Sequence, residues 1–381
     1  MMRIRRTQNT ETRMKKLVKK AVPFAFAISA PFCLSADDAN AEGMLCAAPS
    51  KSTLGTTKAT TTNGNSNSSS SSMMNGQITP PAGPTVQNGA DVFITADFIY
   101  WQASGTGLNY AFNGAPLGSV DTTGHMKSPD FTYEPGFKVG LGVLCDHDNW
   151  DVYAEYTWLT VSKEDTKSTL NGTTASPVQI IPTWPGIETA LVYQTASGEW
   201  SLNFNVLDFE IGRNFWISKR ITFRPHLGMK FSWMEQHFNI EGFNFDGTTA
   251  DNQFKMKQTQ FGVGVRTGLD TAYYFDSKWA IYGDFGVTGL YNYFKESRHD
   301  YTGDTLENTV SQRPQFLTTV VELDLGLRFE TIFSKGRYKY LLQAGWETQM
   351  WFDQEQFIRF TDHNPGNLSL SGLTIKTGFW F

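Results

Sequence analysis

Six histidines are the first residues to consider for catalysis or metal binding, and their spacing matches no familiar site. None of them forms the paired spacing of a zinc-binding motif or of another metal site. They are His125, His147, His226, His237, His299 and His363. Asp and His residues occur near the ends of predicted strands, as at His237, but no nucleophile with a neighbouring base is recognisable. The sequence therefore predicts no enzyme, no catalytic residue, no cofactor and no metal.

Charged side chains at alternate positions within apolar segments are the second candidate chemistry. Acids and bases are both present among them, and the alternation places all of them on one face of the predicted strands. This predicted lumen wall consists of Asp97, Lys138, Asp151, Glu155, Arg224, Lys230, Arg266, Asp284, Glu322, Asp324, Arg328 and Glu347. The alternation places Asp208, Glu210, Lys339 and Lys376 on the same face. Such a wall could select solutes in a channel, or its charges could pair and fill a narrow interior. The sequence leaves both interpretations open.

The segments that carry these charges alternate strictly between apolar and polar residues, which is the signature of a β-strand. Ten such segments occur: 91–101, 137–143, 150–158, 200–211, 221–231, 260–266, 279–287, 317–330, 338–350 and 372–381. In the segment 200–211 the apolar positions change parity, which predicts a β-bulge near Val206. We predict an all-β fold, an antiparallel up-and-down transmembrane β-barrel of about ten strands, or twelve if the long loops hide further hairpins.

Short connections between these segments alternate with long polar ones. The connections at 146–149, 276–277 and 334–337 are short, whereas residues 163–190 form a long polar stretch. This alternation is typical of outer-membrane barrels, with turns on the periplasmic side and loops outside. A secreted sandwich of two sheets is the alternative. Aromatic residues near strand ends favour the barrel, because Trp and Tyr form belts at membrane interfaces. They are Tyr100, Trp101, Trp150, Trp158, Trp200, Trp216, Trp279, Tyr291 and Tyr293.

The N-terminal part of the chain has the composition of a targeting segment followed by a linker. Eight basic residues and one acid precede a short apolar run, and small residues follow at Ala36 and Ala41. This pattern predicts a signal peptide over 1–36, with cleavage after Ala36 or Ala41. Residues 37–90 are rich in Ser, Thr and Asn and are expected to form a disordered tail, and residues 91–381 the barrel. Cleavage would change the net charge from −5 to about −12, which argues against nucleic acid as a partner.

The last strand of the chain ends on aromatic residues. Phe379 and Phe381 end an alternating strand and resemble the C-terminal insertion signal of outer-membrane barrels. Membrane lipid and the barrel-insertion machinery are therefore expected partners, and a homo-oligomer is left open.

Cys46 and Cys145 remain after cleavage, and the compartment permits a disulfide between them. Free thiols are the alternative.

Four stretches together resemble a known family over roughly residues 91–381. They are DFIYWQASGTGLNYA, GFKVGLGVLCDHDNWDVYAEYTWL, NVLDFEIGRNFWISKRITFRPHLGMKFSW and the terminal strand. Their order is similar to that of the MOMP-like, Legionella-type pore-forming outer-membrane proteins. The resemblance implies residence in the bacterial outer membrane and a porin that passes ions or small hydrophilic solutes.

Two other functions remain open, and the charges suggest a selectivity if the barrel conducts. A structural or adhesive surface barrel with a closed lumen is the main alternative, and a barrel enzyme is the third. Acids outnumber bases on the predicted wall, so a conducting barrel should mildly prefer cations. Glu322 and Asp324 are the expected selectivity residues, with Arg328 neutralising part of their charge.

Overall fold

The structure is a computed structural model, and every regular element among its described residues is a β-strand. It describes residues 91–114, 124–145, 150–168, 179–184, 193, 195–243, 250–360 and 365–381, together with Ala82 and Val86. These residues belong to one compact unit, Ser72–Phe381. Among them, no helix is long and apolar enough to cross a membrane. The predicted signal peptide and most of the predicted tail lie outside the described residues.

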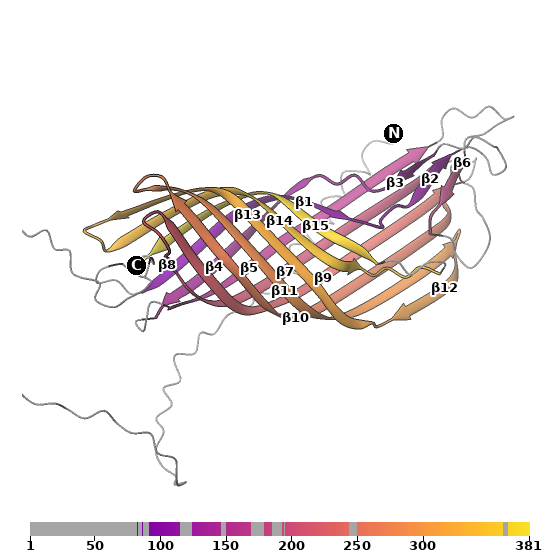
Figure 1. Ribbon diagram of the computed structural model, residues 1–381. Coiled ribbons are helices and arrows are strands. Elements are labelled where there is room, and N and C mark those ends of the chain that lie inside the picture. Colours follow the sequence, from indigo (N-terminus) through magenta and orange to yellow (C-terminus); the bar gives the residue numbers. More distant parts are fainter. Residues whose placement is uncertain are drawn as a thin grey trace, which may run out of the picture. The chain divides into compact units, whose positions relative to one another are not determined.

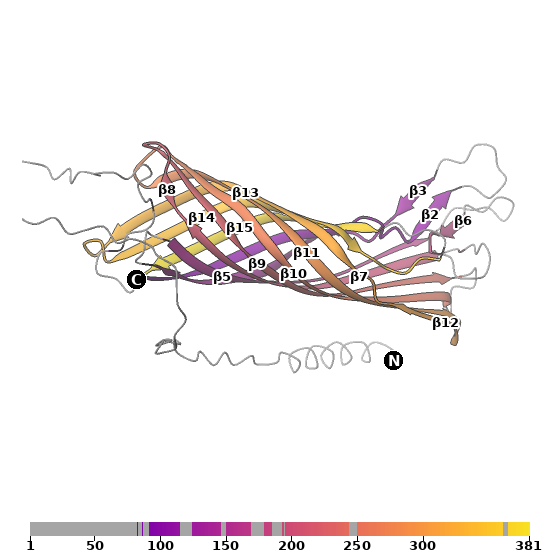
Figure 2. The same cartoon turned by 60° about the horizontal axis from the view of Figure 1, so that its bottom comes forward.

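Ten strands form a closed antiparallel barrel (Figures 1 and 2). They are β1 (Val92–Gly105), β4 (Tyr133–Leu144), β5 (Trp150–Ser168), β7 (Thr195–Arg213), β9 (Ile221–Phe243), β10 (Ala250–Tyr274), β11 (Trp279–Thr302), β13 (Gln315–Phe333), β14 (Tyr338–Glu355) and β15 (Gly366–Trp380). Two further strands join this sheet: β8 (Phe215–Trp216) pairs with β9, and β12 (Thr305–Gln312) pairs with β11. The strands β2 (Ala111–Gly114), β3 (His125–Lys127) and β6 (Gln179–Pro182) form a separate small sheet. The predicted all-β barrel of about ten strands is confirmed.

Pairing between β1 and β15 closes the barrel. It runs antiparallel from Phe93 opposite Trp380 to Gly105 opposite Leu368. The backbone N–H of Phe381 also donates to the carbonyl of Val92 at 3.0 Å. The ring of Phe379 packs on the outside against that of Tyr338, with centroids 5.7 Å apart. Closure matters because a strand edge in lipid would leave backbone polar groups without partners.

The two ends of the barrel differ in their connections. At one end, which we call the turn end, the connections β4–β5, β7–β9, β10–β11 and β13–β14 are short, and Val92 and Trp380 lie there. The opposite end, the loop end, carries the long connections β1–β4, β5–β7 and β14–β15, the shorter connection β9–β10, and also β12 and the small sheet (Figure 1). The predicted alternation of short and long connections is therefore present.

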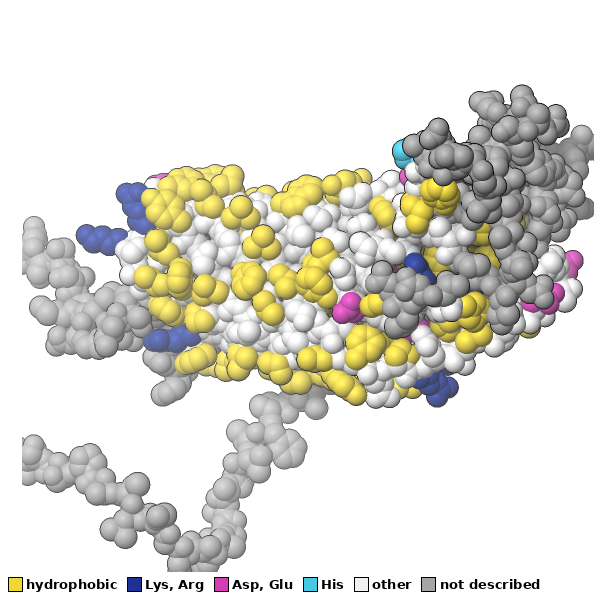
Figure 3. Space-filling view, turned by 45° about the vertical axis from the view of Figure 1, so that its right-hand side comes forward, with side chains coloured by type: hydrophobic (Ala, Val, Ile, Leu, Met, Phe, Trp, Pro, Cys, Tyr) yellow, Lys and Arg dark blue, Asp and Glu magenta, His cyan; other side chains and the backbone are white. Residues whose placement is uncertain are grey.

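An apolar band surrounds the outside of the barrel from the turn end to a row of aromatic residues. Within it, Leu323, Leu325 and Leu327 on β13 are 52–60% exposed. The row consists of Trp233 (β9), Phe261 (β10) and Tyr293 (β11), which are direct cross-strand partners. In Figure 3, hydrophobic side chains spread over the visible outer face, and Lys and Arg lie toward its two ends. We call this part of the barrel the turn-end half and the remainder the loop-end half.

The polarity of the two strand faces reverses between the halves. On β9, the outward positions change from Trp233 to Glu235 and His237, while inward positions change from charged Lys230 to buried Phe238. The same reversal occurs on β7, where the sequence predicted a bulge near Val206. That prediction is wrong, because β7 pairs with β5 and β9 without a register shift there. The parity change marks the point where the outward residues of the strand change from apolar to polar and its inward residues change from polar to apolar.

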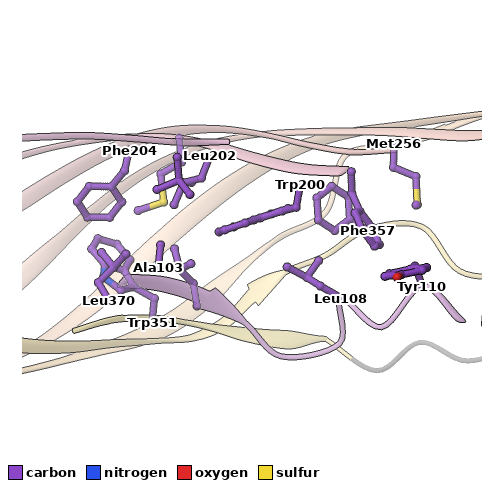
Figure 4. Close-up of a cluster of buried hydrophobic side chains, with 14 of the residues drawn as sticks. Ala103, Leu108, Tyr110, Trp200, Leu202, Phe204, Met256, Trp351, Phe357 and Leu370 are labelled. Atoms are coloured by element: carbon purple, nitrogen blue, oxygen red, sulfur yellow. The ribbon is translucent and has the colours of Figure 1, made fainter. Parts of the chain in front are cut away.

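A hydrophobic core fills the interior of the loop-end half (Figure 4). Among its largest members, Trp101, Trp200, Trp351 and Phe204 are at most 1% exposed. The rings of Phe204 and Trp351 pack edge to face, with centroids 5.4 Å apart. Trp101 and Trp200 were expected in an external aromatic belt, and that expectation is wrong for these two. Alternation alone cannot tell whether a tryptophan near a strand end faces lipid or the interior.

The strands are longer than membrane crossing requires. A tilted membrane-spanning strand needs about 9–11 residues, whereas β9, β10 and β11 have 23, 25 and 24. Residues up to Ser168 belong to β5, although the sequence placed Lys163 onward in a loop. The excess length lies in the loop-end half, whose outward face is polar. The barrel therefore continues beyond its apolar band.

Shortening the closing strand should prevent stable insertion. Deleting residues 378–381 removes the pairs of Trp380, Phe379 and Gly378 with β1, and leaves a β1 edge unpaired in lipid. Phe381→Ser removes the aromatic contact with Phe379 but keeps the pairing, so its effect should be smaller. Heat-modifiable mobility of membrane-extracted protein measures the folded fraction. A folded fraction equal to wild type in the deletion variant would contradict this account of closure.

Candidate functional site in the barrel interior

The ionisable side chains on the inner face of the turn-end half form the candidate site. All of the residues that the sequence assigned to the lumen wall point inward there. They are Asp97, Lys138, Asp151, Glu155, Arg224, Lys230, Arg266, Asp284, Glu322, Asp324, Arg328 and Glu347. The alternation of strands explains this placement, because successive side chains point to opposite faces of a sheet. We call this set, together with the inward charged residues named next, the charged interior.

The charged interior also contains residues outside the predicted wall. Asp270 lies on β10, four residues beyond Arg266 and on the same face, yet the predicted strand ended at Arg266. Extending the alternation along β10 would have found it. His226 on β9 and Glu330 on β13 also face inward. Asp208, Glu210, Lys339 and Lys376, which the alternation also placed on the lumen face, complete the set.

Arg224 and Arg266 connect carboxylates from several strands into one network. The Arg224 guanidinium donates to Glu210 at 2.9 Å and to Asp270 at 2.7 Å, and it also pairs with Asp151. Arg266 donates to the other oxygen of Glu210 at 2.7 Å. Each arginine thus bridges strands that are distant in sequence, and the fork geometry of a guanidinium suits such multiple contacts.

His226 lies in the same network with both ring nitrogens near acids. Its Nδ1 is 3.1 Å from Glu210 and its Nε2 is 3.4 Å from Asp270. Both nitrogens are thus directed at carboxylates rather than at a hydroxyl or thiol, so this histidine has the surroundings of an ion-pair partner. Among the described residues, no group of His, Cys, Asp and Glu could hold a metal ion.

Lysines pair with the remaining carboxylates in the middle of the barrel. Lys230 is 1% exposed, and its Nζ lies 2.8 Å from Asp208 and 2.9 Å from Glu322. Lys138 donates to both oxygens of Glu347, at 2.7 and 2.8 Å. Buried charges need such partners, because removing an ion from water costs several kcal/mol. The paired lysines therefore belong to the packing of the interior.

Lys376 and Lys339 make further ion pairs of the charged interior. Lys376 lies 2.9 Å from Glu155 and 3.6 Å from Asp97. Lys339 is 2.9 Å from Glu330. Arg328 approaches the same carboxylate at 3.9 Å.

Asp284 and Asp324 differ from the other carboxylates because each lies between two acids on the neighbouring strands. Asp270, Asp284, Asp324 and Glu347 are successive cross-strand partners on β10, β11, β13 and β14. Like charges directly opposite each other on a sheet are unfavourable. Asp270 and Glu347 have cationic partners, but within the described residues no Lys or Arg pairs with Asp284 or Asp324 within 4.0 Å. Tyr282 donates its hydroxyl to Asp324 at 3.1 Å.

The cavities around Asp284 are small, whereas a larger one of about 860 Å³ lies at the turn end, where Glu330 and Lys339 contribute to its lining. Asp284 lines one of about 110 Å³ and a neighbouring one of about 160 Å³. Both could hold several water molecules, because one water needs about 10–15 Å³ in this measure. Toward the loop end, the charged interior meets the hydrophobic core directly. Lys138 lies over the Trp101 ring at 4.9 Å, and Lys230 over the Trp351 ring at 5.7 Å.

The closed antiparallel barrel, its apolar outer band and its charged interior define a bacterial outer-membrane protein. The sequence profile of the family described as the Legionella pneumophila major outer membrane protein precursor matches residues 83–381. The chain belongs to this family, which confirms the resemblance found in the sequence and the outer-membrane location. A comparison with curated proteins gives no significant match.

Several solved outer-membrane barrels show a remote likeness to the chain. The protease OmpT of Escherichia coli has 12% identity and a TM-score of 0.37, over 78% of this chain and 99% of OmpT. The attachment invasion locus protein Ail of Yersinia pestis has 9% identity and a TM-score of 0.21, over 76% and 99%. The toluene transporter TodX of Pseudomonas putida has 9% identity and a TM-score of 0.25, over 79% and 91%. Likenesses this remote assign no activity.

The cysteine hypothesis remains a prediction. Cys145 follows β4 at the turn end and forms no disulfide within the described residues. Cys46 lies outside the described residues, as do the candidate cleavage sites at Ala36 and Ala41.

Removing the Lys230 charge should strongly destabilise the barrel. Lys230→Met keeps the approximate volume but leaves Asp208 without its 2.8 Å partner, and breaking a buried pair typically costs about 3–5 kcal/mol. The matched control is Lys257→Met, which removes an exposed partner of Glu235 and should cost less than about 1 kcal/mol. Urea unfolding in lipid vesicles, followed by tryptophan fluorescence, measures both. Equal stability losses would show that burial of the pair is energetically unimportant.

Proposed function

We propose that the protein is a surface barrel with a closed interior, which anchors and presents its loop end outside the cell. This is the structural or adhesive alternative from the sequence, and one observation carries it: the hydrophobic core fills the loop-end half. Trp101, Trp200, Trp351 and Phe204 lie across the interior there with at most 1% exposure. A ten-strand barrel also sits near the width at which side chains alone fill the lumen.

The energetics of the core support a closed interior. A solute path would need the four aromatic side chains to leave their packed positions and meet water. Burying one large apolar side chain is worth about 2 kcal/mol, so exposing four costs on the order of 8 kcal/mol. An open state of that free energy would be rare at equilibrium. The ion pairs of Lys138 and Lys230 beside Trp101 and Trp351 add to the cost of rearrangement.

The loop-end half is suited to presentation. Its outward positions on β9, such as Glu235, His237 and Asn239, are polar and compatible with water. Its hydrophobic core holds the long strands rigid beyond the apolar band. Binding residues commonly lie on loops that such a rigid scaffold positions. The partner that these loops meet would be a host surface or matrix component.

A pore is the second candidate function, and the unpaired carboxylates favour it. Asp284 and Asp324 line the cavity of about 110 Å³ without a Lys or Arg partner among the described residues. Fixed negative charge concentrates cations in a channel with low-dielectric walls. If the hydrophobic core opens under some condition, the charged interior would become a cation-preferring passage. This is the porin function that the sequence predicted.

Conductance separates the two functions. Refolded wild-type protein in a planar bilayer should give no steady channel, because the core blocks the interior. Trp200→Ala combined with Trp351→Ala should give small, steady currents, because the substitutions remove two of the four aromatic side chains that block the interior. The control is Phe285→Ala, which removes a lipid-facing ring of similar size and should stay silent. Steady wild-type channels at native-like folding would overturn the closed-interior proposal and support the pore.

The ion selectivity of carboxylate variants then identifies which charges attract cations. In any conducting form, we expect cation preference that weakens as salt rises, because the screening length falls from roughly 30 Å at 0.01 M to about 3 Å at 1 M. Asp284→Asn with Asp324→Asn should shift the reversal potential toward zero across a salt gradient. Glu322→Gln should shift it less, because Lys230 and Arg266 already neutralise Glu322. The sequence expectation that Glu322 shares this role is revised accordingly. Anion preference in the parent form would contradict the role of Asp284 and Asp324.

A further inference from the structure

The outer surface of β9–β11 changes from aromatic to basic within a few residues. The row Trp233–Phe261–Tyr293 ends the apolar band, with exposures of 38, 52 and 39%. Each strand continues past this row into the loop-end half. In a membrane barrel, such an aromatic row marks the level of the headgroups. The residues that follow on the same outward face therefore lie at or just beyond that level.

The next three outward rows carry most of the basic side chains of this region. Cross-strand pairing aligns them as Glu235–Thr259–Lys295, His237–Lys257–Ser297 and Asn239–Lys255–His299. We call Lys255, Lys257 and Lys295, with His237 and His299, the basic sector. The rise of about 3.3 Å per residue in a strand keeps them within about 20 Å of the aromatic row.

Few acids neutralise the basic sector. Glu235 is shared between Lys257, at 2.7 Å, and His237, at 2.9 Å. Lys255 lies over the Tyr301 ring at 4.9 Å. Within the described part of the chain, neither Lys255 nor Lys295 has a carboxylate within 4.0 Å. The next outward acids are Glu241 on β9, beyond Asn239, and Glu199 on β7, the cross-strand partner of Asn239. Against the three lysines, Glu235 and Glu199 are thus the two acids at the level of these rows on β7 and β9. The sector therefore keeps an excess of positive charge that a partner could neutralise.

The opposite side of the barrel lacks these charges at the same level. There the row Trp346–Leu373–Tyr100 is followed outward by Thr348, Ser371 and Gln102 on β14, β15 and β1. On β7, the outward residues beside Glu235 and His237 are the neutral Asn203 and Ser201. A general need for solubility would place charge around the whole circumference. A basic sector on one side points to a localised anionic partner.

We propose that the basic sector binds the phosphate groups of an outer-leaflet glycolipid. The position argues for a lipid, because the lysines follow the aromatic row directly and the loop end faces outward. Acyl chains would contact Trp233, Phe261 and Tyr293, while phosphates would lie against Lys255, Lys257 and Lys295. Lysine acts as a point charge toward phosphate and needs no fixed geometry. The proposal requires only the outer-membrane barrel and is independent of whether the interior conducts.

Lipid binding by full-length refolded protein tests the proposal. The probe is bisphosphorylated lipid A at a few mole per cent in nanodiscs of neutral phospholipid, with bound lipid counted by native mass spectrometry. The test variant is Lys255→Gln, Lys257→Gln and Lys295→Gln. The matched control is Lys219→Gln, Lys278→Gln and Lys335→Gln, which removes equal charge from exposed turn-end lysines. Each lysine near an anionic surface contributes roughly fivefold, so the test variant should bind on the order of 100-fold more weakly.

Further arms separate phosphate recognition from general effects. Dephosphorylated lipid A should bind wild type as weakly as the phosphorylated lipid binds the test variant, and higher salt should weaken wild-type binding. Lys255→Arg, Lys257→Arg and Lys295→Arg should retain binding, which keeps the test open if the Gln variant folds poorly. Unchanged binding in the Gln variant, an equal loss in the turn-end control, or no dependence on phosphate or salt would each overturn the proposal.

Discussion

The requirement that every backbone polar group in lipid has a partner governs this structure. Helices satisfy that requirement within one segment, but strands satisfy it only when the sheet closes on itself. Here closure depends on β1 and β15, which lie at opposite ends of the barrel sequence and pair through thirteen aligned positions from Phe93 to Gly105. Once the ring is closed, each strand has one inward and one outward face. The position of every side chain discussed above follows from that division.

The exterior decides what the interior must be in each half. In the turn-end half the outward face meets lipid, so apolar residues such as Leu325 are outside and charges must face in. In the loop-end half the outward face meets water, so the charges move outside and Trp200 and Phe238 fill the interior. A narrow barrel cannot leave either interior empty. Ion pairs therefore pack one half, and a hydrophobic core packs the other.

This division also explains why a charged inner wall does not by itself imply that the barrel conducts ions. Most inner carboxylates neutralise a lysine or arginine, as Glu347 does with Lys138. Asp284 and Asp324 differ because the register places them between other acids. On the outside, the same change from lipid to water brings lysines directly beyond the aromatic row on β10 and β11. The point at which the outward face of a strand changes from apolar to polar thus determines three features: which residues fill the interior, where the membrane boundary lies, and where the outer charges begin.

The sequence by itself determined the strand class, the closed barrel and the inward face of residues such as Asp97 and Lys230, because a period of two needs only local information. It also indicated the family through the order of its motifs. Only the tertiary structure decided that the parity change at Val206 is a reversal of environment, that Trp101 and Trp200 are internal, and that Asp270 joins the charged interior. It alone decided which charges pair, since Arg224 meets Asp151 and Asp270 across strands far apart in sequence. Alternation fixes the face of a residue, but register and barrel width fix its neighbours, and these depend on the closed sheet as a whole.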